Sequence, residues 1–175
     1  MKRSVFKWGI APLFACALLA PKPLLAQAVP IKCTGWLVAE LLPGVACISS
    51  AGQFSLKNEV HVVRSEANDW RGTGRLQAVM NLEAQADGSS TFSGTSTLEV
   101  GTWSAAGIFT PTGGVWDVKY TGVVNADGTS EYHMIGVGIG GSIQGLHFNV
   151  TGTRKSASPL DPYHMSGIIT SAGQN

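Results

Sequence analysis

Two histidines on consecutive predicted strands are the residues of this sequence best suited to bind a metal ion. The apolar faces of these strands meet if Tyr132 opposes Phe148, and this register places His133 directly across from His147 on the other face. Two cross-strand imidazoles could supply half of a zinc site. Glu131 is the nearest candidate for a third ligand, and the alternative is a solvated histidine pair. His133 and His147 are therefore weak metal candidates, and the sequence predicts no cofactor.

Other ionisable side chains could transfer protons if they lined a cavity. Asp117 and Lys119 lie two residues apart on one strand face, and Glu131 lies on the next predicted strand. On an outer face, such residues form ordinary cross-strand charge pairs instead. We expect the outer face, because the alternate residues are apolar, and we expect Glu59 and His61 on the polar face of their strand as well. The sequence therefore predicts no catalytic residue and favours a protein that is not an enzyme.

A set of large apolar side chains is expected to face inward. These residues alternate with polar ones, which is typical of strands with one buried face. The set consists of Leu98, Trp116, Tyr120, Met134 and Phe148. If the interior is not filled, these side chains could line a binding site for an apolar or amphiphilic small molecule. Trp70 lies in a predicted polar turn, where it could plug one end of the fold or stack on a ligand.

The strand signals continue through most of the chain and predict an all-β fold. Asp87-Gly88 and Asp127-Gly128 stand in similar surroundings, and Asp-Gly is a strong hairpin signal because glycine accepts a positive φ. Consecutive hairpins that each have one apolar face must bury those faces together. We predict a small antiparallel up-and-down β-barrel of about eight strands, because closure removes exposed edges. A two-sheet β-sandwich is the alternative.

The first 28 residues are expected to be a secretory signal peptide. Lys2 and Arg3 precede an apolar run, and Ala26 and Ala28 form a small-x-small cleavage site. Residues 29–175 would then be a single domain, exported to the periplasm or the extracellular space. The leader holds four of the 12 Lys and Arg residues and none of the 11 acidic residues, so the mature chain has a net charge of −3. Without a basic patch, nucleic acid is not an expected partner.

Two cysteines remain after removal of the leader. Cys33 and Cys47 form an even pair in an oxidising compartment, which predicts a disulfide bond that clips a short N-terminal segment to the domain. Residues 36–42, between the two cysteines, fit either a short helix or a strand, because short apolar runs are ambiguous. A separate strand is expected over 103–110.

One stripe of apolar residues departs from the alternation. Ile135, Val137 and Ile139 occupy the face that should be wet, which a β-bulge, a contact between copies or a membrane-facing surface could explain. The sequence as a whole predicts an exported binding module for an apolar or amphiphilic small molecule. The alternatives are a structural or adhesive envelope protein that self-associates through this stripe, an outer-membrane barrel, and a barrel isomerase or cyclase. Membrane association is not expected.

Overall fold

The computed structural model describes residues 28–156, 158 and 160–171, so the predicted leader at 1–27 lies outside the described residues. These residues form nine strands and one short 3₁₀ helix. In chain order the elements are β1 (Val29–Leu42), β2 (Val45–Ile48), β3 (Phe54–Ala67), η1 (Trp70–Gly72), β4 (Gly74–Ala84), β5 (Ser90–Trp103), β6 (Phe109–Val124), β7 (Ser130–Gly141), β8 (Leu146–Arg154) and β9 (Tyr163–Ser171). Within these residues, no helix is long and apolar enough to cross a membrane.

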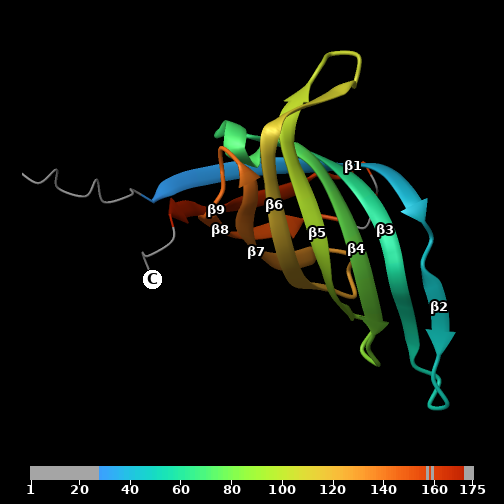
Figure 1. The fold of residues 1–175 in the computed structure, drawn as a ribbon. Coiled ribbons are helices and arrows are strands. Elements are labelled where there is room, and N and C mark those ends of the chain that lie inside the picture. Colours follow the sequence, from blue (N-terminus) through green and yellow to red (C-terminus); the bar gives the residue numbers. More distant parts are fainter. Residues whose placement is uncertain (1–27, 157, 159, 172–175) are drawn as a thin grey trace, which may run out of the picture.

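The strands form one antiparallel sheet that closes on itself. Neighbours along the chain pair from β2 to β9, β9 pairs with β1, and β1 also pairs with β3, so the sheet closes in a ring (Figure 1). Cys33, Thr34 and Gly35 carry the closure, because each pairs with β9 on one side and with β3 on the other. The prediction of an all-β antiparallel fold is confirmed. The sheet has nine strands, and it is one sheet rather than the two of the sandwich alternative.

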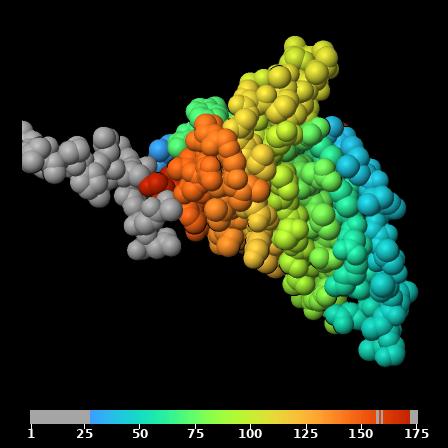
Figure 2. Space-filling view, in the orientation of Figure 1, coloured from blue at the N-terminus to red at the C-terminus, as the bar shows by residue number. Residues whose placement is uncertain are grey.

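Two segments extend beyond the ring. The β5–β6 hairpin continues past the other strands, and the β2 end of the sheet turns away on the opposite side (Figure 2). The separate strand expected over 103–110 is wrong, because Trp103 pairs with Phe109 at the far end of this hairpin. Residues 36–42, which fitted either a helix or a strand, belong to β1.

The alternation of inward and outward residues is clearest in β6 and β7. Trp116 and Val118 are fully buried, while Asp117 and Lys119 between and beyond them are exposed. Alternation of this kind is what a strand with one face on a core requires. The core is a single cluster that draws side chains from β1 and from β4 to β9, with Ile143 contributed by the turn after β7.

Glycines on the inner face make room for aromatic rings on the neighbouring strand. Gly136 pairs with Phe148 and Gly152 pairs with Tyr132, and at both glycines a Cβ atom would collide with the paired ring. Gly94, beneath Tyr120, and Gly122, beneath Phe92, repeat this arrangement. An aromatic ring that covers a cross-strand glycine keeps a curved sheet closed and fixes its register. The glycines in these strands therefore follow from the size of the rings that they face.

The predicted disulfide bond is wrong. Both cysteines are free, with Cys33 buried and Cys47 exposed. Cys33 pairs with Ala67 and Cys47 pairs with Ser55, at opposite ends of β3. At about 3.3 Å per residue these positions are roughly 35–40 Å apart, far beyond the roughly 4.4–6.8 Å between Cα atoms that a disulfide needs. The N-terminal segment is held by strand pairing along β3 and not by a covalent clip.

Candidate functional site

One half of the ring interior is filled by side chains. Trp116 lies at its centre, where its Nε1 donates a hydrogen bond of 2.8 Å to the carbonyl oxygen of Arg71 in η1. The ring of Phe148 meets the indole edge-on, with 4.9 Å between ring centroids. Ile143 is fully buried as well, and the space left beside Trp116 and Phe148 is only about 30 Å³. This end of the molecule is a packed core.

The other half of the interior contains a cavity of about 280 Å³. This volume is close to the lower end of the range for small-molecule sites, which begins at about 300 Å³. Most of the wall is apolar or aromatic. The lining residues are Leu37, Glu59, His61, Val63, Ser65, Leu76, Ala78, Met80, Leu82, Phe92, Tyr120, Val124, Ser130, Tyr132, Met134, Arg154, Tyr163 and Met165. The cavity is the candidate functional site.

A bulge in β3 turns two ionisable residues toward this cavity. Leu56 pairs with Leu82, but the next pair is Glu59 with Met80, so β3 has one extra residue between these pairs. Asn58 sits there with φ of 58°, a left-handed conformation that asparagine adopts more readily than most residues. The bulge reverses the inside and outside positions that follow it. The prediction that Glu59 and His61 point outward is therefore wrong.

Glu59 and His61 contact each other in the cavity wall. The Nε2 atom of His61 lies 3.0 Å from Oε1 of Glu59, and the two side chains are 16% and 13% exposed. Glu40 is the direct cross-strand partner of His61, and one ligand atom from each of the three residues lies within 4.8 Å of the others. One imidazole and two carboxylates form a donor set that could hold a divalent cation such as Zn²⁺. Neither Glu40 nor Glu59 was predicted as a site residue.

Three tyrosines, Tyr120, Tyr132 and Tyr163, line the cavity. The hydroxyl of Tyr120 donates to the carbonyl oxygen of Val79 at 3.0 Å. The ring of Tyr132 packs edge-on against Tyr163, with 5.7 Å between centroids. Burial raises the pKa of all three phenols, so they are neutral near pH 7. Their rings therefore offer uncharged aromatic surface to a ligand, while the hydroxyl groups of Tyr120 and Tyr163 already have partners in the protein.

Arg154 lines the cavity, but its guanidinium group is bound to the loop that precedes β9. Nε donates to the carbonyl oxygen of Asp161 at 3.0 Å, Nη1 donates to the hydroxyl of Tyr163 at 3.2 Å, and Nη2 donates to the carbonyl oxygen of Ser158. The guanidinium also lies 4.6 Å from the ring centroid of Tyr163. Its role in the wall is to fix Tyr163 and the loop.

The residues predicted to line a ligand site divide between the two halves of the interior. Leu98, Trp116, Tyr120, Met134 and Phe148 are all buried. Tyr120 and Met134 border the cavity, whereas Leu98, Trp116 and Phe148 belong to the filled half. Alternation reveals which residues face inward, but it contains no information on where the interior is filled. Trp70 is 54% exposed on η1 and lines neither the cavity nor the small space beside Trp116.

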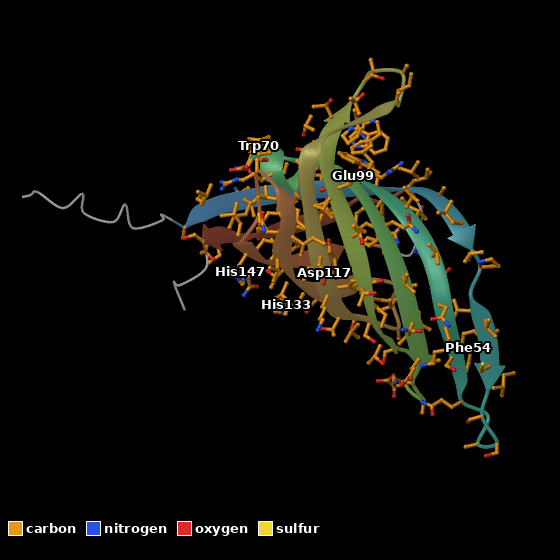
Figure 3. All side chains as sticks on the ribbon, in the orientation of Figure 1. Phe54, Trp70, Glu99, Asp117, His133 and His147 are labelled. Atoms are coloured by element: carbon orange, nitrogen blue, oxygen red, sulfur yellow. The ribbon has the colours of Figure 1, made fainter. Side chains whose placement is uncertain are left out.

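The predicted pairing of His133 with His147 is wrong. His133 pairs with Thr151 and its Nε2 lies 2.7 Å from Oδ1 of Asn149, while His147 pairs with Val137. The register differs because β7 continues to Gly141, and the following turn places Ile143 in the core. The two imidazoles and Asp117 are exposed on the outer face (Figure 3). Lys119 and Glu131 are exposed as well.

A second depression lies on the outer face of the ring. Its volume is about 870 Å³, and outward side chains such as Thr121, Glu131, His133, Thr151 and His164 line it. It is open to solvent and more polar than the interior cavity, whereas sites that bury a small molecule are enclosed and mostly apolar. The interior cavity is therefore the better candidate for ligand binding.

No family model matches this chain, and comparisons with curated proteins and with solved structures find no similar protein. The functional argument therefore rests on the cavity and the side chains around it.

Proposed function

We propose that this protein is an exported β-barrel that binds an apolar or amphiphilic small molecule in its interior cavity. Residues of β1 and of β3 to β9 line this cavity. The observation that carries the proposal is the contrast between the two halves of one ring. One half is packed around Trp116, and the other leaves about 280 Å³ behind apolar and aromatic walls. Interiors of folded proteins are otherwise close-packed, so an unfilled half supports a binding role.

Export is supported by the position of the fold relative to the proposed leader. The first strand begins at Val29, directly after the small residues Ala26 and Ala28 that would mark the cleavage site. Cleavage there would leave every strand of the sheet intact. N-terminal sequencing of protein secreted by its host tests this proposal, and a mature start elsewhere than Val29 would contradict it.

Filling the cavity tests the binding function. Ala78 lines the cavity and is 8% exposed, so Ala78→Phe would place a ring in the space that the ligand occupies. Gln77→Phe places the same ring on the outer face one residue earlier and serves as the control. We expect phenylpropanol, a neutral ligand with a small apolar body, to bind wild type and Gln77→Phe but not Ala78→Phe in isothermal titration calorimetry. Equal binding by all three would refute the cavity as the site.

Two observations favour other functions. Glu59 and His61, which contact each other in the cavity wall, could supply the acid and base that a barrel isomerase or cyclase would need. Ile135, Val137 and Ile139 are 47%, 42% and 58% exposed on the outer face, which favours self-association through this stripe. Sedimentation of wild type and Val137→Lys tests self-association, because this substitution changes the measured mass only if copies of the protein associate through the stripe.

A further inference from the structure

We infer that Glu40, Glu59 and His61 form a binding site for a divalent transition-metal ion such as Zn²⁺ at the edge of the cavity. This site adds a second kind of ligand to the proposed function and does not depend on it. The evidence is the spacing of the three ligand atoms, the closeness of two carboxylates, and the types of donor.

The three ligand atoms have a spacing that suits one metal ion. In a tetrahedral zinc site with bonds of about 2.0–2.2 Å, two ligand atoms lie roughly 3.4 Å apart. Nε2 of His61 and Oε1 of Glu59 lie 3.0 Å apart, so a single ion could contact both. Glu40 is the cross-strand partner of His61, and its ligand atom lies within 4.8 Å of the other two. Because the Glu40 side chain is exposed, it can change rotamer and approach the ion.

The carboxylates of Glu40 and Glu59 lie close enough to repel each other. Within the described residues, neither forms an ion pair with a lysine or an arginine. Arg154 also lines the cavity and keeps its positive charge, and its guanidinium group donates to the loop carbonyls and to Tyr163. His61 can offset one negative charge only if it is protonated. A divalent cation would offset both carboxylates and leave His61 neutral, which is the form that binds metal.

The types of donor indicate the class of ion. Imidazole nitrogen suits Zn²⁺ and other transition metals, whereas Ca²⁺ and Mg²⁺ are bound by oxygen ligands. One histidine with two carboxylates therefore differs from a purely acidic cluster. Three protein ligands also leave one position of a tetrahedral ion open. Since Glu59 and His61 line the cavity, a water molecule or a ligand in the cavity would fill that position.

Titration with zinc tests the site. Wild-type protein, first stripped of metal with a chelator, is titrated with zinc chloride and separately with calcium chloride in isothermal titration calorimetry, with no apolar ligand present. We expect one Zn²⁺ per chain, bound at least about tenfold more tightly than Ca²⁺. His61→Ala and Glu40→Gln should each weaken zinc binding at least about tenfold, because even the loss of a hydrogen-bond partner of a metal ligand has an effect of this size. His133→Ala removes an exposed imidazole from the outer face and should bind zinc as wild type does.

Three results would refute the site. The first is an unchanged zinc affinity in Glu40→Gln, which alters an exposed side chain and keeps the test decisive if His61→Ala does not fold. The second is equal affinity for zinc and calcium, which would show that the carboxylates alone attract the ion. The third is loss of zinc binding in Cys47→Ser, which would assign the ion to the exposed thiol instead. Because the zinc and phenylpropanol titrations are separate, the metal site can fail while the proposed function stands, and the reverse.

Discussion

We expect the filled half of the ring to contribute much of the free energy of unfolding. The substitution Trp116→Phe tests this expectation. Trp116 is fully buried, and its indole nitrogen holds the carbonyl oxygen of Arg71 in η1. Loss of the hydrogen bond leaves that carbonyl without its partner, which costs about 1–2 kcal/mol. The smaller ring leaves a void in a region with only about 30 Å³ of free space, which costs about 1–2 kcal/mol more.

The two contributions predict that Trp116→Phe lowers the free energy of unfolding by about 2–4 kcal/mol. For a chain of this length, each kcal/mol lowers the melting temperature by about 2–4 °C, so a decrease of roughly 10 °C is expected in differential scanning calorimetry. Trp70→Phe makes the same chemical change at a side chain that is 54% exposed, and should change stability by less than about 0.5 kcal/mol.

The same pair of variants separates stability from binding. Trp116 does not line the cavity, so folded Trp116→Phe should bind phenylpropanol as wild type does. Equal melting temperatures for Trp116→Phe and Trp70→Phe would show that the end near η1 is not the packed half. A loss of ligand affinity in the folded Trp116→Phe protein would show that the two halves of the interior are not independent.

Three further substitutions test the bulge, the ring contacts and the cysteines. Asn58→Val should lower the free energy of unfolding in urea by about 1–2 kcal/mol, because a β-branched residue resists a φ of 58°, whereas Asn58→Gly should not; equal losses would contradict the left-handed bulge. Gly152→Ala should destabilise by at least about 2 kcal/mol in the same assay, because its Cβ would collide with the ring of Tyr132, while Gly140→Ala meets open space. Burial, aided by the charge of Asp69, raises the pKa of the Cys33 thiol from 9.0 to about 12. The unfolded chain therefore loses this proton at lower pH than the folded one, and stability should fall from pH 9 toward pH 12; Cys33→Ala should flatten that decline, and an unchanged pH profile would contradict the burial of the thiol.

The strands and turns could be predicted because their signals are local. Trp116 alternates with charged residues along β6, and this alternation survives in the folded sheet. The two Asp-Gly turns also adopt the same structure: Asp87 accepts a 2.9 Å hydrogen bond from the backbone nitrogen of Ser89, and Asp127 accepts one of the same length from Thr129. Gly88 and Gly128 have the positive φ that these turns require.

Register and filling could not be predicted, because they depend on contacts between distant residues. The pairing of β7 with β8 was wrong because Ile143 enters the core from the turn, which its sequence neighbours do not indicate. The predicted disulfide bond is wrong because Cys33 and Cys47, although close in sequence, pair with opposite ends of the long strand β3. The distance between the two cysteines depends on where each pairs with β3, and β3 is long enough to hold them far apart.

The candidate site itself depends on irregular positions in two strands. A regular β3 would turn Glu59 and His61 to the outside, and the bulge at Asn58 turns them in. In β1, the register shift between Leu37 and Ala39 does the same for Glu40, which then pairs with His61. Each register shift interrupts the regular ladder of hydrogen bonds between β1 and its neighbour or β3 and its neighbour. Bulges of this kind are frequent beside functional sites. Two neighbouring strands are thus both irregular where they bring three ionisable side chains together at the edge of an apolar cavity, which supports the proposed binding function.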